Sequence, residues 1–141
     1  MKTILFADDR RSIREYCRAS LEDEGYRVVL ACDGVDAVRA FFGETPDLVI
    51  LDISMPRMNG LEVLERINSI APHIPVVLFT AHDEDCLRDR RASLAAACVG
   101  KDEDPSELKR VVAATLTALS SQDRLNTIRV GLPPRSVNVS R

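Results

Sequence analysis

Residues 47–52, Asp-Leu-Val-Ile-Leu-Asp, decide the fold of this chain. The Leu, Val and Ile residues follow one another without a polar interruption, which is typical of a strand buried on both faces of a parallel sheet. Asp52 comes directly after this run. Open α/β sheets place their ligand sites at the carboxyl ends of the strands. The stretch therefore predicts a central parallel strand that carries an acidic side chain into a functional site.

A second apolar run has the same arrangement. Residues 3–7 predict another strand, and Asp8 and Asp9 follow it directly. Because parallel strands end at the same edge of a sheet, the two strand ends are expected to bring three carboxylates together. Such a group suits a divalent metal ion and a nucleophilic carboxylate.

Strand and helix patterns alternate five times along the chain. The predicted strands are residues 3–7, 27–31, 48–51, 76–79 and about 96–99. The predicted helices start near Ser12, after Asp33, after Asn59, near Asp83 and after Asp104. This alternation predicts an α/β fold, with a doubly wound parallel sheet, helices on both faces and right-handed crossovers. Periodicity alone leaves the strand order open.

The helix signals differ in strength. Ser12 and Glu15 have the spacing of a capping box. Asp104 followed by Pro105 is a strong helix start. The helix expected near Asp83 has a thin apolar stripe and is the weakest of the set.

Length and composition restrict the possible functions. The chain has 141 residues, of which 45% are hydrophobic, and a net charge of −3. These values favour one domain, predicted as residues 1–120, and argue against general affinity for nucleic acid. No apolar run approaches the roughly 20 residues of a membrane span and no signal peptide pattern is present, so we expect a cytoplasmic protein without membrane contact. Residues 121–141 lose the periodic pattern and predict a disordered tail.

The cysteines show no metal-binding pattern. They are Cys17, Cys32, Cys86 and Cys98, and none belongs to a Cys-x-x-Cys pair. Because the chain has only two histidines, a zinc site is not expected. We interpret the cysteines as small buried residues in a reducing compartment.

Polar residues at four strand ends can act together. Thr80 and Lys101 follow two further predicted strands. They are expected beside the carboxylates of Asp8, Asp9 and Asp52 at one edge of the sheet. Clustered carboxylates repel one another unless they bind a proton or a cation, and Mg²⁺ prefers oxygen ligands. Asp52 is suited to attack a phosphoryl donor, while Lys101 and Thr80 stabilise charge on the transferred group.

These residues belong to a longer ordered set. The set consists of Asp8-Asp9, Asp52, Met55-Pro56, Asn59-Gly60, Thr80-Ala81 and Lys101. It resembles the motif of the receiver domain of bacterial two-component response regulators, and the resemblance covers about residues 2–119. The resemblance implies a flavodoxin-like fold with strand order 2-1-3-4-5. It also implies a phosphoacceptor signalling domain rather than an enzyme, with self-catalysed phosphotransfer and autodephosphorylation.

The resemblance further implies roles for single residues. Asp52 is expected to accept a phosphoryl group from the phosphohistidine of a histidine kinase or a histidine phosphotransfer protein, and Thr80 and Lys101 to engage the phosphate. The implied Mg²⁺ ligands are Asp8, Asp9, Asp52 and the backbone carbonyl of Ser54. Signalling is expected through protein contact at the face formed by the fourth helix, fifth strand and fifth helix, without direct nucleic-acid binding.

Cys98 is a departure from the family pattern. Response regulators usually have Tyr or Phe three residues before the lysine, and here that position is Cys98. In the family, the aromatic side chain moves together with the threonine that turns toward the phosphate, which corresponds to Thr80. Because Cys98 is too small to do this, we expect a smaller conformational change in this chain. A second hypothesis therefore stays open, a receiver-like adaptor that binds partners without phosphorylation.

Two other classes fit the sequence less well. An aspartyl-phosphate hydrolase of the haloacid dehalogenase type needs a second acid two residues after its nucleophile, and this chain has Ser54 there. A flavodoxin-like flavin binder needs a phosphate loop rich in Ser, Thr and Gly after the first strand. Residues 8–11 are Asp-Asp-Arg-Arg instead, whose carboxylates would repel a phosphate.

Overall fold

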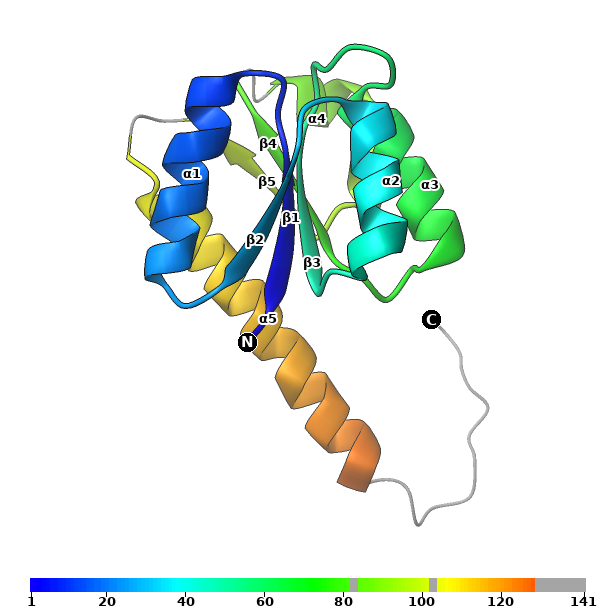
Figure 1. The fold of residues 1–141 in the computed structure, drawn as a ribbon. Helices are drawn as coiled ribbons and strands as arrows, with labels where there is room; N and C mark the ends of the chain where they lie inside the picture. The colour runs from blue at the N-terminus through cyan, green and yellow to red at the C-terminus, as the bar shows by residue number, and fades with distance from the viewer. Residues whose placement is uncertain (82–83, 102–103, 129–141) are drawn as a thin grey trace.

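The computed structural model describes residues 1–81, 84–101 and 104–128, with side chains as far as residue 119. It contains a five-stranded parallel sheet in the order β2-β1-β3-β4-β5 (Figure 1). The strands are β1 Thr3–Ala7, β2 Arg27–Ala31, β3 Leu48–Asp52, β4 Val76–Thr80 and β5 Ala97–Gly100. The helices are α1 Arg11–Asp23, α2 Gly34–Glu44, α3 Gly60–Ile70, α4 Glu84–Arg88, the 3₁₀ helix η1 Arg90–Leu94 and α5 Ser106–Ile128. The predicted fold class and the strand order implied by the resemblance are confirmed.

The central strands of the sheet are buried on both faces. Every residue of β3 and β4 is buried, as are residues 4–7 of β1. Ile50 in β3 pairs with Phe6 in β1 and with Val77 in β4. Because both faces of these strands are covered, their sequences are continuous apolar runs rather than alternating patterns. The edge strands β2 and β5 are less buried.

Helices cover both faces of the sheet (Figure 1). α1 and α5 lie on one face and contribute Leu21 and Leu108 to its core. α2 and α3 lie on the other face and contribute Phe41 and Leu64 to a second core. Since all strands run the same way, the segments that follow β1, β3, β4 and β5 emerge at one edge of the sheet.

The starts of α2 and α3 follow from local sequence. Asp33 is the N-cap of α2, and its side chain accepts a hydrogen bond from the backbone N–H of Asp36 at 2.8 Å. Asn59 caps α3 in a capping box with Glu62. Such side chains satisfy N–H groups that lack a partner within the helix. Both helices begin where the sequence predicted them.

The capping box predicted at Ser12 and Glu15 is wrong. α1 starts at Arg11, and its N-cap Arg10 makes no side-chain capping hydrogen bond. The backbone N–H of Arg10 donates to Asp8 Oδ1 at 2.9 Å instead. Glu15 forms an exposed ion pair with Arg11. The first turn of α1 is thus organised by the residue that ends β1, because the connection between the two elements is very short.

The described part of the segment between β4 and β5 forms two short helices. α4 spans only Glu84–Arg88, and η1 follows at Arg90–Leu94. Neither helix has a buried residue. The segment is attached to the core through partly buried side chains, among them Cys86 and Ala92. The weak apolar stripe predicted for this helix is confirmed.

α5 continues beyond the predicted end of the folded domain at residue 120. The helix ends at Ile128, so the prediction of disorder is wrong for residues 121–128. Figure 1 shows the C-terminal part of α5 extending past the sheet. A helix that does not cover the sheet needs no apolar stripe, which explains why the pattern is lost before the helix ends. Residues 129–141 of the predicted tail lie outside the described residues, and no described helix has the length and apolar character of a membrane span.

The interpretation of the cysteines needs correction. Cys17 is buried as predicted, but Cys32 is exposed. Cys98 is exposed and forms a disulfide with the half-buried Cys86 of α4. Cys98 lies on the edge strand β5, whose outward side chains have no neighbouring strand to cover them. Sequence reasoning could not pair the two because the short α4 brings Cys86 to β5 only in three dimensions.

Candidate functional site

Three carboxylates meet at the carboxyl edge of the sheet. Asp8 and Asp9 follow β1, and Asp52 is the last residue of β3. One oxygen of each carboxylate lies within 4.8 Å of the corresponding oxygens of the other two. Asp8 is fully buried and Asp52 is 6% exposed, whereas Asp9 lies at the surface. The structure therefore brings together the three acids that the strand ends predicted.

Lys101 supplies a positive charge to this acidic group. Its Nζ lies 2.6 Å from Asp8 Oδ2 and 3.3 Å from Asp52 Oδ1, and its side chain is 11% exposed. The backbone N–H of Lys101 donates to the carbonyl of Thr80 at 2.8 Å, so the ends of β4 and β5 are joined there. Buried ionic groups are costly unless they are paired, and this ammonium partly compensates the buried carboxylates.

The environment of Asp52 changes its acidity. Burial is the largest cause and the nearby Asp8 carboxylate is the next, and they raise the pKa of Asp52 from 3.8 to about 6. Lys101 acts in the opposite direction. The carboxylate is therefore mostly ionised at neutral pH. An additional cation would nevertheless stabilise its ionised form more than it would stabilise an ordinary surface carboxylate.

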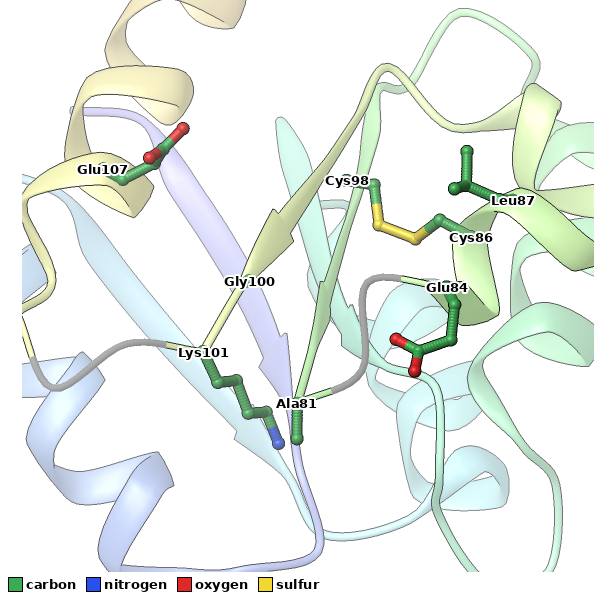
Figure 2. Close-up of a pocket in the computed structure, with 8 residues that line it drawn as sticks. All are labelled: Ala81, Glu84, Cys86, Leu87, Cys98, Gly100, Lys101 and Glu107. Carbon is green, nitrogen blue, oxygen red and sulfur yellow. A yellow bond between two sulfur atoms is a disulfide. The ribbon is translucent and has the colours of Figure 1, made fainter.

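Asp52 opens onto a small cavity that contains most of the predicted site residues. The cavity has a volume of about 200 Å³. Its lining is formed by Asp9, Arg10, Asp52, Ser54, Thr80, Ala81 and Lys101. Thr80 is only 2% exposed. Asp8 does not line the cavity, but it is paired with Lys101, which does. Figure 2 shows the Lys101 side chain reaching from the end of β5 toward Ala81 at the end of β4.

Gly60 allows α3 to start directly against the end of β3. A side-chain carbon at this position would overlap the backbone carbonyl of Asp52. The N–H of Gly60 also donates to the carbonyl of Ile53 at 2.8 Å. The sequence predicted a helix start after Asn59 and placed Asn59-Gly60 in the ordered set of motif residues. The packing of Gly60 against the backbone of Asp52 is a further role, which becomes visible only in the folded structure.

A contact that sequence reasoning missed holds the loop after β3. Arg57 pairs with Asp33, the N-cap of α2, through Nε at 2.9 Å and Nη2 at 3.3 Å. Met58 lies so close to Gly34 that no side chain would fit there. These contacts fasten the loop that contains Ser54 to the start of α2. The residues are 24 positions apart, so no local spacing signals this pair.

The donor set fits a divalent metal ion. Oδ2 of the buried Asp8 accepts no hydrogen bond within the described part of the chain, although it is paired with Lys101. Together with Asp9 and Asp52, it offers only carboxylate oxygens, which hard divalent cations prefer. A cation here would also relieve the repulsion that contributes to the raised pKa of Asp52.

Comparison with known proteins gives a consistent family assignment. Residues 4–113 match the response regulator receiver domain family. Over 110 residues the chain is 38% identical to the response regulator MprA of Mycobacterium ulcerans, a match that covers 78% of this chain and 47% of the relative. MprA of a Mycobacterium species, strain KMS, is 39% identical over the same length. The chain thus spans about half the length of the curated relatives it matches.

Solved structures show the same similarity. The response regulator TrrA of Thermotoga maritima, solved with Mg²⁺-BeF, is 38% identical, with a TM-score of 0.77 over 81% of this chain and 98% of that one. TrrA in complex with the histidine kinase ThkA gives a TM-score of 0.74 over 81% of this chain and 97% of that one. NtrX of Brucella abortus is 28% identical and gives a TM-score of 0.84 over 96% of this chain, but over 32% of its own.

Proposed function

This chain belongs to the response regulator receiver domain family, and we propose that Asp52 is its phosphoryl acceptor. The observation that supports this most directly is the position of the Asp52 carboxylate. It lies at the end of a central strand, 3.3 Å from the Lys101 ammonium, and lines a cavity that it shares with Thr80. The proposed donor is the phosphohistidine of a histidine kinase or of a histidine phosphotransfer protein.

The proposed transfer is a displacement at phosphorus. A carboxylate oxygen of Asp52 forms the new P–O bond while the P–N bond of phosphohistidine breaks, and the electron pair of that bond stays on the imidazole nitrogen, which takes a proton from solvent. Lys101 and Thr80 would stabilise the charge on the transferred oxygens. Water later hydrolyses the acyl phosphate in the same cavity. The domain is therefore a self-modifying signalling protein rather than an enzyme with a separate substrate.

The proposed metal is Mg²⁺. The carboxylates of Asp8, Asp9 and Asp52 would hold it, together with the backbone carbonyl of Ser54, a residue that lines the same cavity. When bound, the ion would neutralise charge on the phosphoryl oxygens and on the carboxylates. The Mg²⁺-BeF complex of the similar TrrA supports this choice of metal.

The proposed partners are proteins. The complex of ThkA with TrrA supports a histidine kinase as the upstream partner. We place the downstream contact on the face formed by α4, β5 and α5, with no direct binding of nucleic acid or membrane. We also place the protein in the cytoplasm, where soluble signalling partners are available.

Intact-mass measurement after incubation with acetyl phosphate and Mg²⁺ tests the acceptor. The wild-type protein should gain the mass of one phosphoryl group, and Asp52→Asn should gain none, because an amide is not a nucleophile. Asp23→Asn, which changes an exposed carboxylate at the end of α1, is the matched control and should be labelled like the wild type. An undiminished adduct in Asp52→Asn would refute the assignment. A wild type that is never labelled would favour the adaptor hypothesis.

A further inference from the structure

The disulfide between Cys86 and Cys98 ties α4 to the edge of the sheet. The two residues are 12 positions apart, and their Cα atoms are separated by 6.6 Å. This separation is within the usual range for disulfides. Cys98 is exposed on the edge strand β5, whereas Cys86 is half-buried. A soluble thiol can therefore approach the bond from the Cys98 side.

α4 packs loosely against the described part of the fold. None of its residues is buried, and Leu87 is 87% exposed. Cys86 is the α4 residue that packs against the hydrophobic core of the described chain, and it does so as a partly buried side chain. Elements with little buried apolar surface open locally at low free-energy cost. The position of α4 therefore depends strongly on the covalent bond.

The disulfide lines a pocket, whose lining residues are drawn in Figure 2. The pocket has a volume of about 600 Å³. Ala81 and Lys101 line both this pocket and the smaller cavity at Asp52. Only Val99 and Gly100 separate Cys98 from Lys101 in sequence. The bond thus joins the chain shortly after Thr80 to the chain just before Lys101.

We propose that Cys86 and Cys98 form a reversible thiol–disulfide site, whose reacting partner is a soluble dithiol and whose redox state sets the mobility of α4. The proposal goes beyond phosphotransfer and rests on the proposed function only for the cytoplasmic location. Disulfides that form in a reducing compartment are commonly transient and redox-sensing. An accessible bond that holds a weakly packed helix suits such a role better than a permanent structural one.

The chemistry is ordinary thiol–disulfide exchange. A thiolate of the dithiol attacks Cys98 Sγ, the bond between the two protein sulfurs breaks, and Cys86 Sγ leaves with the electron pair and takes a proton. The second thiol of the reductant then attacks the mixed disulfide and releases the Cys98 thiol. The protein gains two thiols, and the dithiol is oxidised to its disulfide.

Thiol counting tests the site itself. The full chain is equilibrated with reduced or with oxidised dithiothreitol, denatured in acid and alkylated, and its intact mass is measured. The reduced protein should carry two more alkyl groups than the oxidised protein, because Cys17 and Cys32 are free in both states. Cys32→Ser should keep this difference, whereas Cys86→Ser and Cys98→Ser should lose it. No difference in the wild type, or an oxidised product that pairs Cys32, would overturn the proposal.

Hydrogen exchange tests the consequence for α4. Amides of residues 84–88 should exchange about tenfold faster in the reduced wild type than in the oxidised wild type, while those of α1 stay unchanged. Cys86→Ser should resemble the reduced protein under both conditions. Equal exchange in the two redox states, despite a confirmed disulfide, would also overturn the proposal. Neither measurement needs phosphorylation, so failure here is distinct from failure of Asp52 as acceptor.

Discussion

Asp52 stands between opposing electrostatic influences. Burial and Asp8 disfavour its negative charge, whereas Lys101 at 3.3 Å favours it. A fully neutralised carboxylate would be a poor nucleophile, and a fully uncompensated one would be protonated. The geometry leaves Asp52 ionised at neutral pH and responsive to any further positive charge.

The raised pKa of Asp52 predicts a pH-dependent stability. Folding raises this pKa from 3.8 to about 6, so the folded protein binds the proton more tightly than the unfolded chain does. The resulting stabilisation is complete below the unfolded value and is lost as the pH rises through the folded value. Without metal, the wild type should therefore lose on the order of 2 kcal/mol more than Asp52→Asn between acidic and neutral pH. Urea denaturation of both proteins in EDTA at ~pH 4 and ~pH 7 measures this difference, and equal losses would contradict it.

Mg²⁺ should raise the melting temperature. The ion relieves repulsion among Asp8, Asp9 and Asp52 only in the folded state, and a ligand at ~100 times its dissociation constant adds ~2.7 kcal/mol. The check is a thermal melt over a millimolar Mg²⁺ titration. Asp9→Ala should lose most of the rise, whereas the surface variant Asp23→Asn should keep it. A flat titration for the wild type would rule out the proposed metal site.

At the scale of single elements, the close approach of α3 to the end of β3 requires glycine at position 60, and a larger residue there should lower the stability of the protein. Gly60→Ala forces a methyl group into the carbonyl of Asp52 and should destabilise the protein by about 2 kcal/mol or more. Gly43→Ala is the matched control, because Gly43 lies in α2 with open space around it. That variant should be neutral or stabilise the protein by up to about 1 kcal/mol. Denaturant unfolding compares them, and a similar effect in both would show that the close approach is unimportant.

The segment around α4 should respond most to phosphorylation. Beryllofluoride with Mg²⁺ should change hydrogen exchange more in residues 84–101 than in α1, because Thr80 and Lys101 join the phosphate site to this segment. This change in hydrogen exchange should be larger in the reduced protein, in which no disulfide links α4 to β5. A larger change in α1 would contradict this route.

Cys98→Tyr separates the two roles of position 98. This variant restores the aromatic residue common in the family, but it also removes the disulfide, so Cys98→Ser is the necessary reference. A wider exchange difference in Cys98→Tyr than in Cys98→Ser would show that the aromatic side chain itself strengthens the coupling. Equal differences would assign the effect to release of α4.

For the whole molecule, the sequence predicted the regular parts of the fold well. Continuous apolar runs such as residues 48–51 identified the central strands, because a strand buried on both faces needs an apolar residue at every position. The positions of Asp8, Asp9 and Asp52 followed, since the sheet determines the place of a polar residue at the end of such a run. The sequence could not reveal contacts between distant residues, such as Arg57 with Asp33 or Cys86 with Cys98. Nor could it reveal the end of α5, because the apolar pattern stops before the helix does.

Because α5 extends past the sheet, a small rotation of the helix moves its C-terminal end by a larger distance. Leu116 is a buried residue of α5 in the hydrophobic core, and the helix continues to Ile128. At a rise of 1.5 Å per residue, Ile128 lies about 18 Å from Leu116 along the helix axis. A tilt of about 10° at the sheet would then displace the tip by about 3 Å. A small change in the tilt of α5 is thereby a larger displacement at Ile128.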